Sequence, residues 1–191
     1  MLKEKRVALI GIGNIMFHDE GMGAYLVNYI KENYEEHPNL TVVEGGTLGF
    51  GLMTYYQEYD KIIVVGTGSK NDKVGTISSE NAQEIISNES VTRKTANEVE
   101  ITMMIEICSF HENMGDVQLI TMVPSDIIEV KNGMTSEVLL HMPKFVEATL
   151  KELKSSGIEL QKKRKTVSFE EIIQICANPK VSHYNDMSNL K

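Results

Sequence analysis

Four short apolar runs without polar alternation are spaced along the chain, and they predict buried strands. They cover residues 6–11, 40–43, 61–65 and 117–123, and a shorter edge strand is expected at residues 74–78. Continuous apolar strands are typical of a parallel sheet with both faces covered. The pattern therefore predicts a sheet in the interior of the domain.

The segments between these runs carry the periodicity of amphipathic helices. The spacing of one buried helical stripe occurs at Met22, Tyr25, Leu26, Tyr29 and Ile30. Similar spacing predicts helices near residues 49–59, 98–110 and 136–154, and Pro143 predicts either a kink or a new start in the last one. Because strands and helices alternate, we predict an α/β fold, a doubly wound three-layer sandwich with a mostly parallel central sheet and helices on both faces.

The last part of the chain has a different character. The basic run at residues 161–165 lies between polar stretches and predicts a solvated linker. Ser168 and Glu171 have the spacing of a capping box, which predicts one more helix over residues 169–177. The tail after Pro179 is polar, and we expect it to be mobile.

Composition narrows the functional classes. The chain has 191 residues, with 19 Lys and Arg against 27 Asp and Glu, so its net charge is −8, whereas a nucleic-acid partner requires clustered Lys and Arg. No apolar run approaches the roughly 20 residues that span a bilayer, so we expect no membrane insertion. The two cysteines do not make a disulfide framework. We therefore expect a cytoplasmic protein, and a monomer, because no pattern indicates an extensive apolar interface.

Candidate chemistry lies just after the predicted strands, because open parallel sheets bind ligands outside the carboxyl ends of their strands. Gly11 and Gly13 follow the first strand, but the third glycine of a dinucleotide fingerprint is replaced by Met16. No signature of nucleophilic Ser or Cys catalysis is found. Asp19 and Glu20 remain, either as carboxylates that complement a helix N-terminus or as metal ligands at the mouth of the sheet.

The order of these motifs resembles that of a known family. Gly11-Ile-Gly-Asn14 is followed by Asp19-Glu-Gly-Met-Gly23, and Gly45-Gly-Thr47 comes after the second strand. This order resembles the nickel-iron hydrogenase maturation endopeptidases, and the later elements follow in family order to about residue 154. The resemblance divides the chain into a maturation-protease-like α/β domain at residues 1–155 and a C-terminal extension at residues 156–191, with a basic linker, one short helix and a polar tail.

The resemblance also implies an activity. Family members are hydrolases of the aspartic-type endopeptidase group that remove a C-terminal extension from the hydrogenase large-subunit precursor once nickel is loaded. They have no catalytic nucleophile, and they recognise the nickel carried by the substrate with a Glu, an Asp and a His. The metal is expected to polarise the scissile carbonyl or a water.

The family positions map onto this chain one by one. The family Glu falls on Glu20, the family Asp on Gly66 and the family His on Asn97. Glycine supplies no side-chain ligand, and the amide oxygen of asparagine suits hard cations better than nickel. His18, Glu44 and Glu98 are the candidate accessory ligands. Alternatively, His18 points elsewhere, Glu44 orders the loop with its two glycines, and Glu98 complements a helix start.

Three hypotheses follow from these substitutions. The chain is an endopeptidase with a changed metal site, as the signature and Glu20 indicate. Alternatively, it is a non-catalytic paralogue that binds a hydrogenase subunit or another maturation partner without cleavage, as Gly66 and Asn97 indicate. In the third hypothesis, the protein has the protease-like fold but binds a small molecule around Glu20 and Glu44.

Overall fold

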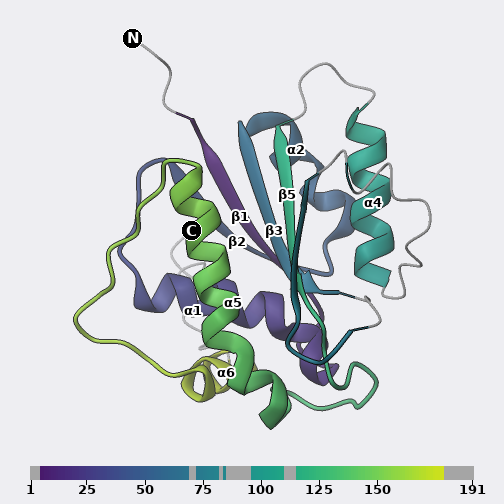
Figure 1. The fold of residues 1–191 in the computed structure, drawn as a ribbon, viewed down its shortest axis with the longest axis vertical. Helices are drawn as coiled ribbons and strands as arrows, with labels where there is room; N and C mark the ends of the chain where they lie inside the picture. Colours follow the sequence, from purple (N-terminus) through teal and green to yellow (C-terminus); the bar gives the residue numbers. More distant parts are fainter. Residues whose placement is uncertain (1–4, 69–71, 82–83, 85–95, 110–114, 179–191) are drawn as a thin grey trace, which may run out of the picture.

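A five-stranded sheet forms the centre of the molecule (Figure 1). The computed structural model describes residues 5–68, 72–81, 84, 96–109 and 115–178. The spatial order of the strands is β2-β1-β3-β5-β4, and their bounds are β1 (Val7–Ile12), β2 (Leu40–Gly46), β3 (Lys61–Thr67), β4 (Ile77–Asn81) and β5 (Asp116–Met122). All pairs are parallel except β4 with β5, which is antiparallel at the edge. The predicted edge strand is present, but it begins at Ile77.

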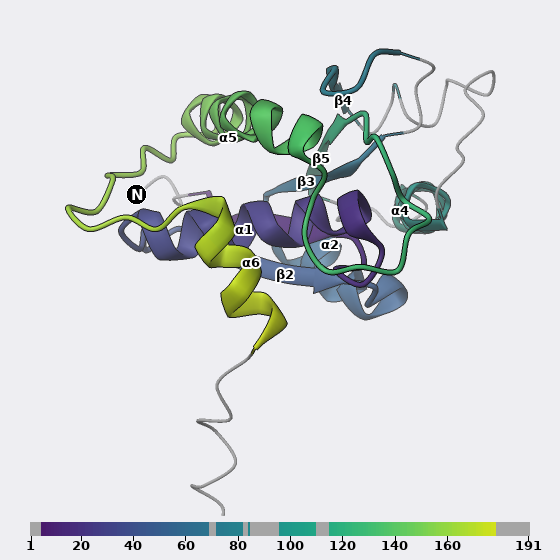
Figure 2. The same ribbon diagram turned by 90° about the horizontal axis from the view of Figure 1, so that it is seen from below.

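Helices cover both faces of this sheet (Figures 1 and 2). One face carries α1 (Met22–Asn33), α5 (Ser136–Ser155) and α6 (Phe169–Ala177). The other carries the 3-10 turn η2 (Gly49–Leu52), α2 (Met53–Glu58) and α4 (Ala96–Ser109). Alternate residues of β1 serve the two cores: Val7 and Leu9 join the α1 side, and Ala8 and Ile10 join the α4 side. The predicted three-layer α/β sandwich is confirmed.

Helix α5 runs through its proline without ending. It spans Ser136–Ser155 with Pro143 inside, so of the two predicted alternatives, a kink or a new start, the new start does not occur. Buried side chains stand on both sides of the proline, at Met142 and Phe145, and anchor one continuous apolar stripe. Packing of that stripe offsets the one helical hydrogen bond that proline removes.

Helix α6 packs against α1. The predicted capping box is present, because the Ser168 hydroxyl accepts from the backbone N–H of Glu171 and the Glu171 carboxylate accepts from that of Ser168. Phe169 stacks on Tyr29 with ring centroids 4.2 Å apart, and Ile172 is fully buried. The division of the chain at residue 155 stays a prediction, and the polar tail beyond residue 178 lies outside the described residues.

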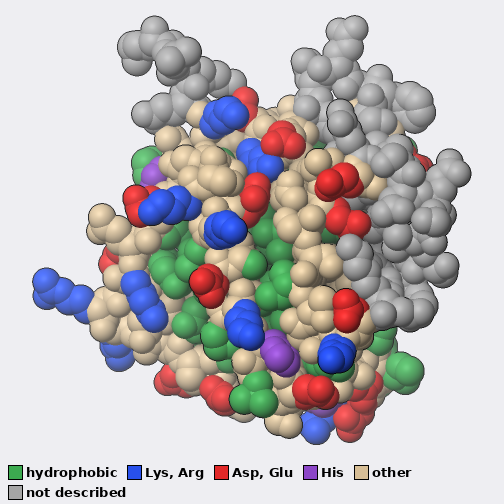
Figure 3. Space-filling model, viewed as in Figure 1, with side chains coloured by type: hydrophobic (Ala, Val, Ile, Leu, Met, Phe, Trp, Pro, Cys, Tyr) green, Lys and Arg blue, Asp and Glu red, His purple; other side chains and the backbone are tan. Residues whose placement is uncertain are grey.

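The basic run is tied to the body through its backbone. The N–H of Lys163 donates to the carbonyl of Asn33, and the N–H of Glu35 donates to that of Gln161, each at 2.8 Å. On the face seen in Figure 3, basic and acidic side chains are interspersed. Over the part of the chain that the structure describes, no helix is long and apolar enough to cross a membrane.

Candidate active site at the carboxyl edge of the sheet

The strand order places a switch point at the carboxyl ends of β1 and β3. The chain leaves β1 toward β2 on one side and returns to β3 on the other, and ligands in such sheets bind where these connections diverge. The loop after β1, the end of β3 and residues 123–135 after β5 all come together at this edge. Figure 2 shows that last segment crossing beside the start of α1.

Close backbone approach explains the glycines of the opening motif. A Cβ on Gly23 would lie 2.3 Å from the carbonyl oxygen of Val65, and one on Gly13 would lie 1.9 Å from that of Glu20. Gly13 also has a φ of 131°, which L side chains rarely adopt. Gly23 therefore lets the start of α1 lie directly against β3, and Gly13 lets the loop after β1 lie against the turn that holds Glu20. No phosphate-binding role is needed to explain either glycine.

Asp19 is a structural residue that holds the loop after β5. Its side chain is fully buried. Its Oδ2 accepts from the backbone N–H groups of Ser125 and Asp126, and its Oδ1 accepts from that of Thr135, over 2.7–3.0 Å. The Thr135 hydroxyl also donates to Oδ2 and caps α5 by accepting from the N–H of Val138. Because both carboxylate oxygens of Asp19 already accept hydrogen bonds from these donors, the structure favours a structural role for Asp19 over a role as a metal ligand.

Glu20 lies in the 3-10 turn η1 (His18–Gly21), which precedes α1 and contacts β3. The side chain is half-buried, and this burial raises the pKa of its carboxyl. A half-buried carboxyl with a raised pKa at a switch point is suited to hold a proton or to contact a cation.

Gly66 lies within β3, beside the same edge, and a side chain there would require Ile12 to shift. A Cβ there would be 2.6 Å from Cγ1 and 3.0 Å from Cδ1 of Ile12. The Ile12 side chain therefore fills the space that an Asp at position 66 would need. Asn97 falls in the first turn of α4, and the side chains of Asn97 and Glu98 lie outside what the structure describes.

The accessory candidates are placed differently from one another. Glu44 lies inside β2 and is exposed, and its Oε2 accepts from the side-chain amide of Asn28 at 2.7 Å. His18 is buried with its Nδ1 3.5 Å from Oε2 of Glu129. Asp126 stands beside them, and hydrogen bonds from backbone N–H groups hold the pKa of its carboxyl below the usual value.

Sequence reasoning missed Asp126 and Glu129. They follow β5 as Asp126-Ile-Ile-Glu129, at the same carboxyl edge as the loops after the other parallel strands. Their place directly after a predicted parallel strand is the sequence feature that could have identified them as candidates. Their proximity to His18 has no sequence signature, because it depends on the loop that Asp19 holds.

Exposed apolar side chains lie on the segments that follow three strands at this edge. They come from the loops after three different strands, and we call this set the rim: Met16, Leu48, Phe50, Ile128 and Val130. Backbone pairing brings two parts of the rim together, since the N–H of Lys131 donates to the carbonyl of Met16 at 2.9 Å. Exposed large apolar side chains at a ligand-binding edge of a sheet are a feature of interaction sites.

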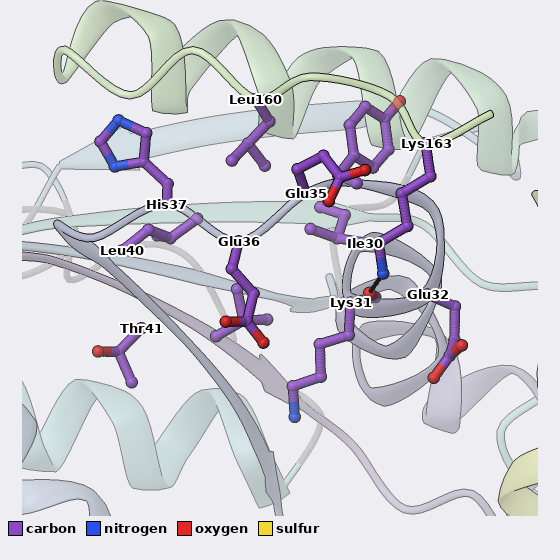
Figure 4. Close-up of a pocket in the computed structure, with 12 residues that line it drawn as sticks. Ile30, Lys31, Glu32, Glu35, Glu36, His37, Leu40, Thr41, Leu160 and Lys163 are labelled. Atoms are coloured by element: carbon purple, nitrogen blue, oxygen red, sulfur yellow. Dashed lines mark hydrogen bonds between the residues drawn. The ribbon is translucent and has the colours of Figure 1, made fainter. Parts of the chain in front are cut away.

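A pocket lies at the opposite, amino edge of the sheet. It has a volume of about 550 Å³ and is lined by residues from the end of α1, the start of β2 and the segment after α5. Figure 4 shows Lys163 donating to the backbone of Lys31 beside Glu35 and Leu160. No family position lies in this pocket.

The comparisons with known proteins point to one family. A model of the hydrogenase maturation protease family matches residues 24–152. The chain is 28% identical over 160 residues to the hydrogenase expression/formation protein HupD of Rhizobium leguminosarum bv. viciae, covering 80% of this chain and 76% of that protein. It is 24% identical over 161 residues to the hydrogenase 2 maturation protease of Escherichia coli (strain K12), covering 81% and 94%.

A solved structure agrees in fold. The hydrogenase maturating endopeptidase HybD from E. coli matches with a TM-score of 0.75 at 22% identity, covering 83% of this chain and 98% of that one. The fold is thus of the α/β class found in that endopeptidase. Because the family model spans more than half of the sequence, the chain belongs to the hydrogenase maturation protease family. The matched range, residues 24–152, begins after Glu20.

Proposed function

We propose that this chain is a maturation endopeptidase that binds a nickel-iron hydrogenase large-subunit precursor and removes its C-terminal extension. Family membership supports the class of reaction. The observation that carries the proposal is Glu20, a half-buried carboxyl with a raised pKa at the switch point of the sheet. In this proposal the nickel is carried by the substrate, and the chain acts in the cytoplasm as a monomer.

The rim supports a protein substrate. Ile128 is 83% exposed and Val130 is 69% exposed, and both stand on the loop that passes beside Glu20's turn. Exposed apolar side chains on a loop that pairs with the turn of Glu20 suit the binding of a polypeptide before one of its bonds is hydrolysed. Glu20 would contact the nickel centre of the seated precursor, where the metal supplies Lewis-acid polarisation.

The residues present do not fit the recognition of nickel by a Glu, an Asp and a His that the resemblance implies. Gly66 supplies no ligand, and Ile12 fills the adjacent space. The structure describes two of the three family positions in full, 20 and 66, and of these only Glu20 offers a side chain that could bind a metal. This observation favours a second candidate function, in which the chain binds the precursor through the rim without cleaving it.

A processing assay separates the two functions. Purified full chain is incubated with nickel-loaded precursor, and the C-terminal extension is followed by mass spectrometry. The endopeptidase proposal expects complete removal, lost in Glu20→Gln, and slowed in Ile128→Ser but not in Ile175→Ser, a matched exposed apolar residue on α6. Binding of the precursor without processing would establish the second function instead.

A restoration variant sharpens that second outcome. Because Ile12 occupies the space next to residue 66, the informative variant combines Ile12→Ala, Gly66→Asp and Asn97→His. If the wild-type chain binds the precursor without cleaving it, cleavage of the precursor by this triple variant would show that the wild-type chain is inactive because it lacks the two ligands. An intact wild-type activity that survives Glu20→Gln would contradict the role of Glu20.

A further inference from the structure

The side chain of His18 is buried, yet none of the residues that the structure describes makes a hydrogen bond to its ring nitrogen Nδ1. The residue is 6% exposed, and among the described residues its Nδ1 has no hydrogen-bond partner. Glu129 Oε2 lies 3.5 Å from it, beyond the usual hydrogen-bond range of about 2.7–3.2 Å. A buried polar atom left without a partner lowers stability, so such an atom in a native protein requires a reason.

Asp126 and Glu129 supply carboxylates at the same point. One ligand atom from each of these residues and one from His18 all lie within 4.8 Å of one another. Two ligands of a tetrahedral ion with bonds of about 2.1 Å are about 3.4 Å apart. The 3.5 Å between Nδ1 of His18 and Oε2 of Glu129 matches that separation.

The backbone fixes this arrangement before any ligand arrives. The N–H of His18 donates to the carbonyl of Lys131 at 3.0 Å, and its φ of 47° lies in the left-handed region that His adopts more readily than most residues. Asp126 Oδ1 accepts from the N–H groups of Ile128 and Glu129 at 2.8 and 3.1 Å. These contacts hold the imidazole and the Asp126 carboxylate on two segments that are themselves locked together by Asp19.

We propose that His18, Asp126 and Glu129 bind one divalent first-row transition-metal ion of the zinc class, through His18 Nδ1 and one oxygen of each carboxylate. The two carboxylates balance the charge of the ion, and three protein ligands leave one position for a water or a substrate group. An imidazole among the ligands favours zinc over the hard cations magnesium and calcium. The ion is held by the chain itself and does not depend on the proposed cleavage.

The site would stiffen part of the rim. Ile128 lies between two of the ligands in sequence, and Val130 follows directly after Glu129. An ion that joins the loop after β5 to the turn before α1 restricts the segment on which both apolar side chains stand. Metal binding is therefore expected to slow amide exchange over residues 126–131.

Calorimetric titration of the metal-free full chain with Zn²⁺ tests the proposal, with Mg²⁺ as the comparison ion. We expect one Zn²⁺ per chain, and Mg²⁺ binding at least about tenfold weaker. His18→Asn keeps a residue that tolerates the left-handed backbone, and Glu129→Gln keeps the size of the side chain. Each should weaken Zn²⁺ binding at least about tenfold. Co²⁺ loaded in place of Zn²⁺ should show visible absorption that both variants lose.

The matched control is Glu147→Gln, which removes an exposed carboxylate on α5 away from the cluster. It should bind Zn²⁺ like the wild type, and circular dichroism should show that all variants are folded. Absence of stoichiometric Zn²⁺ binding by the wild type, or unchanged binding by His18→Asn and Glu129→Gln, would overturn the proposal. Equal affinity for Zn²⁺ and Mg²⁺ would also overturn it. No precursor enters these measurements, so their outcome is separate from that of the processing assay.

Discussion

The side chain of Ile12 occupies the space beside the Cα of Gly66. A Cβ added at Gly66 would meet Ile12 Cγ1 at 2.6 Å, a separation that real Cβ atoms essentially never show. The two residues belong to the neighbouring parallel strands β1 and β3 at the switch point, and the sequence resemblance implies an acidic ligand at position 66. An acidic side chain at position 66 would therefore require Ile12 to shift.

This packing predicts the cost of restoring the acid. Gly66→Asp should lower the free energy of unfolding by about 1–3 kcal/mol, the usual cost of overpacking a core. The same change in an Ile12→Ala background should cost less, and a double-mutant cycle from urea unfolding measures the difference. Gly51→Asp is the matched control, since a Cβ there meets its nearest neighbour at 3.7 Å. Additive effects of Ile12→Ala and Gly66→Asp would contradict the packing argument.

Asp19→Asn is expected to loosen the loop after β5. An amide group offers one acceptor oxygen where the carboxylate serves three backbone N–H groups, so donors at Ser125, Asp126 or Thr135 lose their partner. Each unsatisfied buried donor costs about 1–3 kcal/mol, and the free energy of unfolding should fall by at least that much. Hydrogen exchange should show reduced protection of these amides. Asp72→Asn, at an exposed position, should change neither quantity.

Helix α6 should depend on one buried side chain. Ile172 is fully buried against the core on the α1 side, whereas Ile175 on the same helix is 47% exposed. Ile172→Ala should lower the free energy of unfolding by about 2–5 kcal/mol, and Ile175→Ala by no more than about 0.5 kcal/mol. Urea unfolding checks both values. Equal effects of the two changes would show that α6 does not pack as described.

The thiol of Cys176 should react slowly at neutral pH. Burial, reinforced by the nearby Glu44 carboxylate and opposed by Lys31, raises the pKa of Cys176 to about 11 from the ordinary 9.0. About one thiol in a thousand is then ionised at pH 8, and only the thiolate reacts. In a Cys108→Ala background, which leaves a single thiol, the alkylation rate should rise about tenfold per pH unit from 8 to 10.

The same shift predicts a pH dependence of stability. The folded state favours the neutral thiol, so its contribution is present below pH 9.0 and is lost as the pH rises through about 11. Glu44→Gln removes a negative charge and should lower the pKa of Cys176, which speeds alkylation at pH 8. Glu147→Gln, an exposed carboxylate on α5, is the control. An alkylation rate at pH 8 typical of an exposed thiol would contradict the assigned burial.

Local patterns predicted most of the elements because each has a cause within a few residues. The apolar runs that became β1, β3 and β5 need burial on both faces, and the capping box at Ser168 defines the start of α6 without any distant contact. Pro143 is different, because whether a helix continues through a proline depends on the packing on either side of it. The pairing of the basic run with Asn33 and Glu35 was likewise not visible, since it joins segments more than 100 positions apart.

The sequence by itself determined the α/β class, the family signature and the position of Glu20 just after the first strand. It also showed that Gly66 supplies no ligand, because a glycine has no side chain to offer. Only the tertiary structure decided that Ile12 fills the vacated space, that Asp19 serves a distant loop, and that His18 meets Asp126 and Glu129. Those relationships join loops after different strands, and parallel strands are brought side by side only by the folded sheet.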